Sequence, residues 1–193
     1  ALGHQRPQGT TGLVGRLDIL ETNVYDTQIT GPRVQAMQTW DGGVFQVLLP
    51  ELFMNETQVS PAMNTMINGY LRVMDSVKTN GLMAAFSASE GLATYNGQQG
   101  IQNMALNPDA VRSSTWQQVI TVHALQLAMM HNPQAALRDL QELQRLHPGV
   151  FSERFGWLDG VDLIQGQVVQ RMLALDKGLG LNAMCYFAGI EGA

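Results

Sequence analysis

Two neighbouring segments of this chain carry opposite hydrophobic patterns, and together they restrict the fold more than any other feature. From Trp116 to Met130 apolar residues recur on every side of a helix and leave almost no polar stripe to face water. Asn132-Pro133 then opens a segment, ending at Leu146, with leucines on one helical face and charged residues on the other. The pattern predicts a buried inner helix at 116–130, joined by a tight turn to an antiparallel outer helix at 133–146.

Further segments also favour helices. Ser60-Pro61 supplies a capping hydroxyl and a proline at the first helical position, and apolar residues then recur at helical spacing from Met63 to Val77, until Asn80-Gly81 ends the pattern. Shorter helices are expected at 44–53, 163–175 and 179–188. Alternating inner and outer helices are typical of an α/α toroid or a layered helical array. We therefore expect one all-α domain over residues 17–193, with short irregular or β-like loop segments.

Composition excludes several classes of function. The 193 residues are 45% apolar and 14% charged, which suits one sizeable core. Sixteen acidic residues against eleven basic ones give a net charge of −5 without a Lys/Arg cluster, so a nucleic-acid partner is not expected. Apolar runs fall short of the roughly 18 residues of a membrane span, so none is expected.

The cysteine content and the first residues concern the setting of the chain. Cys185 has no second cysteine with which to pair, and the simplest interpretation is a buried, inert thiol. Low cysteine content is compatible with the cytoplasm and with a bacterial periplasm. Residues 1–16 are rich in Gly, Gln and Thr without periodicity, and they lack an initiator Met and the regions of a signal peptide. We interpret them as a loop or tail, lying across a partner surface, at a processed or trimmed end.

Four polar stretches between the expected helices combine carboxylates with glycine: 40–43, 86–100, 151–160 and 175–180. Three of them carry an aromatic residue. Aromatic faces stack on the apolar side of a pyranose, while carboxylates and amides take its hydroxyls. Glycosidic cleavage also needs two carboxyl groups, one protonated and one ionised. The alternative for each acid is a helix cap or a turn residue, and for each aromatic it is packing. The composition therefore indicates sugar chemistry but leaves both interpretations open.

The order of these stretches carries a resemblance to a known family. The motifs are Trp40-Asp41-Gly42-Gly43-Val44-Phe45, Ser87-Ala88-Ser89-Glu90-Gly91, Tyr95-Asn96-Gly97, Pro133-Gln134-Ala135-Ala136-Leu137, Arg154-Phe155-Gly156-Trp157-Leu158-Asp159 and Leu175-Asp176-Lys177-Gly178. In this order, over roughly residues 24–189, they resemble the C-terminal half of the glucoamylase-like family, which includes bacterial β-1,2-glucan-degrading enzymes and helical domains of cyclic β-glucan synthases. Each motif is short and degenerate.

The resemblance implies a six-hairpin α/α toroid of which this chain holds about half. Its active cleft would be ringed by loops at one end of the inner helices. The missing N-terminal half, a separate chain, a swapped dimer or a partner protein would complete the cleft. The resemblance also implies a bacterial protein of the periplasm or the extracellular space, acting on an oligosaccharide or polysaccharide.

One departure from the family pattern keeps two functions open. Residues 46–53 replace the more polar run expected of the degrading enzymes and are closer to the synthase version. The first function is a glycoside hydrolase or transglycosidase that acts on a bacterial β-glucan or related polysaccharide. The second is a non-catalytic glycan-binding or assembly subunit that retained the toroid. The acids should converge on one cleft in the first case and scatter into caps and salt bridges in the second.

The resemblance and the local chemistry together select the candidate residues. Glu90, whose carboxylate the hydroxyls of Ser87 and Ser89 can orient, is the expected proton donor. Asp176, at the start of an apolar helix whose amides favour a carboxylate, is its expected counterpart. The remaining candidates are expected to bind substrate, and Trp157 beside Asp159 can stack a sugar ring and fix a hydroxyl: Trp40, Asp41, Tyr95, Glu153, Trp157 and Asp159.

Histidine spacing gives no reason to expect a metal. His123 lies within the apolar segment 116–130 and is interpreted as a satisfied core histidine. His4, His131 and His147 show no ligand spacing to one another. No metal and no cofactor are predicted.

Overall fold

The computed structural model describes residues 24–28, 33–107, 109 and 119–189. The helices are α2 (Val44–Leu48), α3 (Glu51–Met54), α4 (Glu56–Val59), α5 (Pro61–Ser76), α7 (Val122–Ala128), α8 (Pro133–Leu146) and α9 (Ala174–Phe187). The strands are β1 (Val24–Gln28), β2 (Arg33–Met37), β3 (Ser89–Glu90), β4 (Tyr95–Asn96), β5 (Val119–Thr121), β6 (Phe151–Ser152), β7 (Gly156–Trp157), β8 (Gly160–Asp162) and β9 (Gln167–Val168). Short 3₁₀ turns lie at Gln102–Met104 and Pro148–Val150. The expected tail at residues 1–16 lies outside the described residues.

The two longest predicted helices begin where the sequence places them. The Ser60 side chain accepts a hydrogen bond from the Met63 N–H, and Pro61 opens α5. Asn132 caps α8 in the same way, through a bond from the Ala135 N–H. Both predicted starts are confirmed. The end of α5 differs from the prediction, because the helix stops at Ser76 and Asn80-Gly81 forms a separate turn with positive φ.

Three predicted helices require correction. Residues 44–53 are split into α2 and α3 at Leu49-Pro50, where proline removes a backbone donor. The segment 116–130 is not one helix: the β-branched run Val119–Thr121 forms strand β5, and only Val122–Ala128 is helical. Residues 116–118 lie outside the described part. Residues 163–175 are not helical before Ala174, where α9 begins, five residues earlier than the predicted start at 179.

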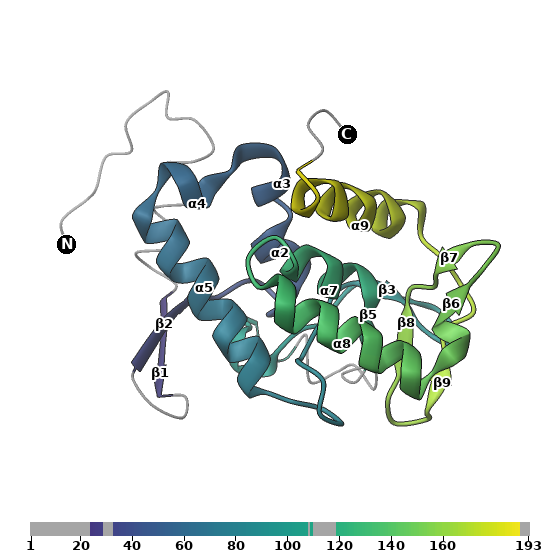
Figure 1. Cartoon of the computed structure of the whole chain (residues 1–193). Helices are drawn as coiled ribbons and strands as arrows, with labels where there is room; N and C mark the ends of the chain where they lie inside the picture. The colour runs from purple at the N-terminus through teal and green to yellow at the C-terminus, as the bar shows by residue number, and fades with distance from the viewer. Residues whose placement is uncertain (1–23, 29–32, 108, 110–118, 190–193) are drawn as a thin grey trace.

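The small sheets correct the all-α expectation. The strands β5, β8 and β9 form an antiparallel sheet in the order β5-β8-β9, and β1-β2, β3-β4 and β6-β7 form hairpin pairs. The sheets lie at the ends of a largely helical body, with β6 to β9 beside the start of α9 (Figure 1). At the other end, β2 packs on α5. A Cβ at Gly69 would lie only 1.8 Å from the Gln35 carbonyl oxygen, so glycine permits this contact.

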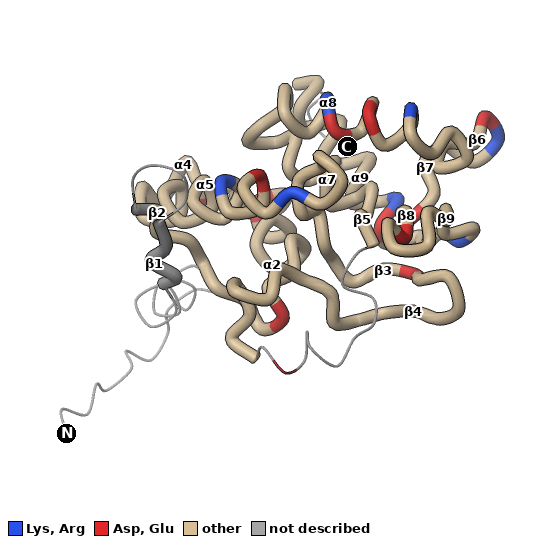
Figure 2. Tube along the Cα trace, turned by 90° about the horizontal axis from the view of Figure 1, so that it is seen from below, with Lys and Arg blue, Asp and Glu red and all other residues tan. Residues whose placement is uncertain are grey.

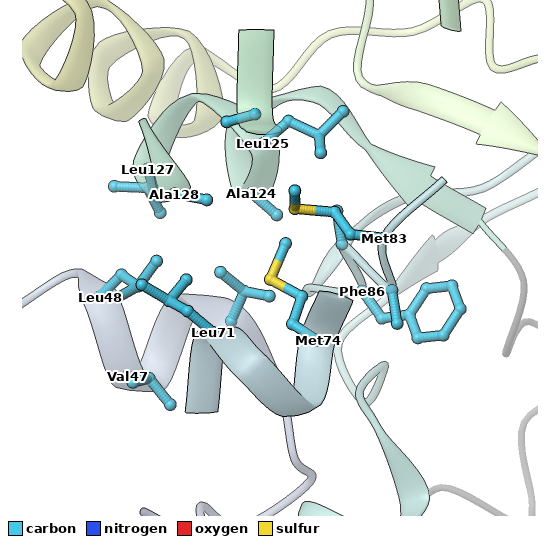
Figure 3. Close-up of a cluster of buried hydrophobic side chains, with 14 of the residues drawn as sticks. Val47, Leu48, Leu71, Met74, Met83, Phe86, Ala124, Leu125, Leu127 and Ala128 are labelled. Carbon is cyan, nitrogen blue, oxygen red and sulfur yellow. The ribbon is translucent and has the colours of Figure 1, made fainter. Parts of the chain in front are cut away.

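The core is built around α7. All seven residues of α7 are buried, whereas α8 buries only Ala136, Asp139, Leu140 and Leu143. The predicted inner and outer roles of these segments are therefore confirmed. Side chains from α2, α5, the extended segment after α5, and α7 meet in one cluster (Figure 3). Thr121 ties α7 to the extended segment through two bonds to the Ala85 carbonyl.

The last helix, α9, covers α7 on the side away from α5 (Figure 1). It buries Asp176, Leu179, Gly180 and Ala183. A Cβ at Gly180 would lie 1.9 Å from the Gln126 side-chain oxygen, which shows how closely α9 approaches α7. It also exposes large apolar side chains: Leu175, Leu181, Met184, Tyr186 and Phe187. None of the helices in the described part is long and apolar enough to cross a membrane.

Candidate functional site

A pocket of about 160 Å³ lies between α7, α9 and the β6–β7 hairpin. Its polar lining comprises His123, Gln126, Asp159, Asp176 and Lys177, and Trp157, Phe155 and aliphatic side chains of α7 and α9 complete the wall. The volume is below the roughly 300 Å³ at which pockets for drug-sized ligands begin. The pocket therefore fits one small ring or the end of a chain.

Asp159 reaches the pocket because it sits between β7 and β8, directly after Trp157-Leu158. Its carbonyl accepts the Val122 N–H at the start of α7. Its carboxylate accepts the Leu173 N–H at 3.0 and 3.2 Å, just before α9 begins. Burial raises the pKa of Asp159 and the nearby Asp176 adds to this, while the Leu173 N–H opposes it. Asp159 thus ties the strand end of the fold to the start of α9.

Asp176 lies in the first turn of α9 and is buried. Its Oδ2 atom lies 3.2 Å from Nδ1 of His123, the second residue of α7. The prediction that His123 is a satisfied core histidine is wrong in one respect, because both ring nitrogens are enclosed and neither has a hydrogen-bond partner among the described residues. The close packing of α7 and α9 therefore brings together a histidine and a carboxylate that are 53 residues apart.

Glu90 is held from the neighbouring loop. It lies on β3, and its Oε2 accepts a hydrogen bond of 2.9 Å from Arg171 Nη1. Arg171 Nη2 donates to the Ala93 carbonyl at 2.9 Å, so one guanidinium joins the β3–β4 hairpin to the segment before α9. Sequence analysis expected serine hydroxyls to orient Glu90. Instead Ser89 donates to a backbone carbonyl, and Arg171 positions the carboxylate.

Electrostatic interactions place several candidates near one another. Tyr95 pairs with Glu90 across the β3–β4 hairpin. Burial raises the pKa of its phenol, and the carboxylates of Asp176, Glu90 and Asp41 raise it further. Acidic residues on β3 and near β8 also lie at the same end of the molecule (Figure 2). The negative charges of these carboxylates therefore act on the same region, around Tyr95 beside the pocket.

The stretch 40–43 forms a tight turn behind this region. Asp41 is buried, accepts the Gly43 N–H at 2.8 Å, and has its pKa raised by that burial. Gly42 adopts φ +73°, and a Cβ there would lie 2.2 Å from the Ile101 carbonyl oxygen. Tyr70 donates to the Gly42 carbonyl at 2.7 Å. Trp40 projects outward and is exposed. The glycines of this motif are required by close backbone packing.

Two predicted candidates differ in placement. Trp157 lines the pocket and packs edge to face on Phe151, with ring centroids 5.3 Å apart. Glu153 is exposed in the turn between β6 and β7 and does not line the pocket. The structure thus brings Trp157, Asp159 and Asp176 into one pocket. Glu90 and Asp41 lie close enough for their charges to act on Tyr95. The structure gives no corresponding evidence for Trp40 or Glu153.

Sequence analysis missed three residues of this region: His123, Arg171 and Lys177. Burial lowers the pKa of Lys177, and Asp159 opposes that shift. Its ammonium donates to the Phe155 carbonyl at 3.4 Å. Lys177 directly follows a selected residue and could have been included, whereas nothing local in the sequence marks His123 or Arg171. Within the described ranges, no group of three or more His, Cys, Asp or Glu residues could hold a metal ion.

No protein-family model and no curated protein sequence matches this chain. Solved structures do. An endo-β-1,2-glucanase from Talaromyces funiculosus, in complex with sophorose, has a TM-score of 0.67 at 13% identity, over 87% of this chain and 34% of its own. An endo-β-1,2-glucanase from Chitinophaga pinensis, in complex with sophorotriose and glucose, has 0.59 at 13%, over 88% and 43%. A candidate glucoamylase from Bacteroides uniformis has 0.61 at 16%, over 88% and 42%.

These comparisons establish the fold. The predicted resemblance to glucoamylase-like proteins and β-1,2-glucan-degrading enzymes is confirmed at this level, and it extends over most of the described chain. The chain spans between 34% and 43% of the length of these structures, so its fold corresponds to a part of theirs.

Proposed function

We propose that this chain is a carbohydrate-active domain, part of a glycoside hydrolase or transglycosidase that acts on a β-glucan or a related polysaccharide. The observation that carries the proposal is the convergence of Trp157, Asp159 and Asp176 on one pocket. An aromatic face and carboxylates around a small pocket suit a neutral pyranose, whose ring stacks while its hydroxyls donate to the acids. The fold shared with two endo-β-1,2-glucanases supports the choice of substrate class.

The proposed chemistry uses two carboxyl groups. One donates a proton to the glycosidic oxygen, and the other takes a proton from water or attacks the sugar directly. Glu90 and Asp176 are the proposed pair, with Glu90 as the donor. Asp41, Tyr95 and Asp159 are proposed to bind sugar hydroxyls, together with Trp157 beneath the ring, while Trp40 and Glu153 stay as outer contacts.

Asp159 is a competing candidate for the proton donor. Burial raises its pKa, and a general acid must hold its proton near the working pH. Glu90 instead is engaged by Arg171, whose Nη1 donates to its Oε2 at 2.9 Å. Experiments should therefore compare the two acids rather than test Glu90 alone.

The second candidate function is a non-catalytic glycan-binding or assembly subunit. It is favoured by the same contacts, because Glu90 is in a salt bridge and Asp159 accepts a backbone N–H. Such engagement is typical of acids with structural roles. Under this alternative, glycan binds without being cleaved.

Completion of the site is proposed to require more polypeptide. The exposed apolar face of α9 is continuous with α3, where Phe53 and Met54 are also exposed. Chains of the same fold are more than twice as long. We infer that helical polypeptide, either the rest of a longer protein or another chain, covers this face, and that the complete protein acts in the periplasm or the extracellular space.

The test uses β-1,2-linked gluco-oligosaccharides with calorimetry and reducing-end release as readouts. Glu90→Gln and Asp159→Asn preserve shape while removing one acid each, and Glu142→Gln, in the surface ion pair of α8, is the matched control. The proton donor is the acid whose amide variant binds the oligosaccharide but no longer cleaves it. Binding without cleavage by the parent protein supports the subunit alternative. No binding by the parent protein, with or without a completing chain, would exclude both functions.

A further inference from the structure

His123 and Asp176 present three enclosed polar atoms without a hydrogen bond: both ring nitrogens and the carboxylate Oδ2. Their nearest approach is 3.2 Å, between Nδ1 and Oδ2. Buried polar groups are almost always hydrogen-bonded, so three unsatisfied atoms at one contact need an explanation. The contact also lies in the wall of the pocket, because both residues line it.

We propose that His123 is a positioning residue for Asp176. A proton on Nδ1 attracts Oδ2 and fixes the rotation of the carboxylate. Oδ1 forms no hydrogen bond with the described residues, and it is then the oxygen presented to a sugar hydroxyl in the pocket. This inference rests on the proposed function, since it names the residue that prepares Asp176 for its ligand.

The surroundings of the pair favour this role over plain packing. Asp159 and Lys177 line the same pocket as the pair, so charged groups of both signs share this pocket with His123. The carboxylate of Asp176 favours a proton on the ring nitrogen that it approaches, Nδ1. Which ring nitrogen of a neutral histidine carries the proton is decided by such a partner. The two residues stand on helices in direct contact, because Gly180 of α9 packs against the end of the Gln126 side chain of α7.

The decisive experiment compares two amide variants. In His123→Asn the amide nitrogen can take the place of Nδ1, whereas in His123→Gln the longer side chain carries it toward the position of Nε2. If an Nδ1 donor orients Asp176, His123→Asn retains the affinity for sophorose and His123→Gln loses about tenfold to a hundredfold. Thermal unfolding of both variants separates this effect from stability. A structural role predicts losses of affinity that follow the losses of stability in both variants.

A second measurement is independent of any ligand. Nitrogen NMR of the imidazole reports which ring nitrogen carries the proton, in the parent protein and in Asp176→Asn. The proposal requires the proton on Nδ1 in the parent. A proton found only on Nε2 overturns the proposal, whether or not sophorose binds.

The two measurements also separate this inference from the proposed function. A parent protein with the Nδ1 proton that binds no sophorose, even with the completing polypeptide, overturns the function and the ligand role of Asp176 with it. A parent protein that binds sophorose while both amide variants bind equally well overturns the positioning role alone.

Discussion

Helices α8 and α9 have the same length, fourteen residues, and opposite surfaces. α8 buries Leu140 and Leu143 and exposes Arg138 and Arg145, and it closes its own surface ion pair between Glu142 and Arg145. α9 buries an aspartate and a glycine and exposes leucine, methionine and phenylalanine. The first helix has the surface of a finished outer layer. The second exposes an apolar surface, of which Leu181 and Met184 line the pocket.

The largest expected difference between the helices concerns their leucines. Leu143 of α8 is fully buried, whereas Leu181 of α9 is 63% exposed. Leu143→Ala is expected to lower the free energy of unfolding by about 2 to 5 kcal/mol, because it leaves a cavity. Leu181→Ala is expected to change it by less than about 0.5 kcal/mol, as for other surface positions. Urea unfolding of the two variants measures both values.

Equal losses of unfolding free energy in the two leucine variants would contradict the proposed difference between α8 and α9. They would show that Leu181 is already covered in solution, for instance by self-association through α9. Sedimentation of the parent protein at several concentrations distinguishes that case from an isolated chain.

A smaller difference is expected between the buried aspartates of the two helices. Asp139 of α8 accepts the Met83 N–H at 2.7 Å and the Arg138 Nε–H at 2.8 Å. Asp139→Ala leaves a buried N–H unsatisfied and is expected to cost about 1 to 3 kcal/mol. Asp176→Ala removes a carboxylate that forms no aligned hydrogen bond with the described residues, so a smaller cost, below about 1 kcal/mol, is expected. Thermal and urea unfolding check both.

A cost for Asp176→Ala as large as that for Asp139→Ala would count against a functional Asp176. It would indicate that the aspartate is held in α9 for stability, like its counterpart in α8.

The smallest expected effect is a dependence on pH at the start of α9. Burial raises the pKa of Asp159 above its ordinary value of 3.8, so the folded protein keeps this proton to a higher pH than the unfolded chain does. The free energy of unfolding should therefore fall as pH rises from about 4 through the raised value, and then level off. Asp159→Asn removes this dependence. Unfolding curves for the parent and the variant, recorded from pH 3.5 to 7.5, should show a difference that favours the parent most at low pH.

A difference that instead grows in favour of the parent as pH rises would mean that the Leu173 N–H outweighs burial. Asp159 would then be a poor candidate for a proton donor.

The parts of the fold that the sequence predicts are those determined by local chemistry. A serine or an asparagine before a proline marks the starts of α5 and α8, because the capping bond joins residues three apart. The failures lie where apolar runs allow two structures. Val119–Thr121 and the residues around β8 and β9 are apolar enough for a helix, and strand pairing with a distant partner decides against it.

The candidate site divides in the same way. Trp157, Asp159 and Asp176 could be selected because they stand in polar, glycine-bounded loops next to aromatic or helical segments. His123 could not be selected, because its adjacent residues in the sequence are apolar and its role depends on a carboxylate in another helix. Arg171 is likewise identified only by its contact with Glu90, across 81 residues of sequence.

Gly180 also acts as a spacer for the pocket. Asp176 stands one turn before it on the same face of α9, and His123 stands about one turn before Gln126 on α7. The end of the Gln126 side chain fills the space that a Cβ at position 180 would need, one turn away from the imidazole and the carboxylate. A larger residue at position 180 would have to displace this amide, which also lines the pocket. A single methyl group on α9 could thus change the lining of the pocket without any substitution within that lining.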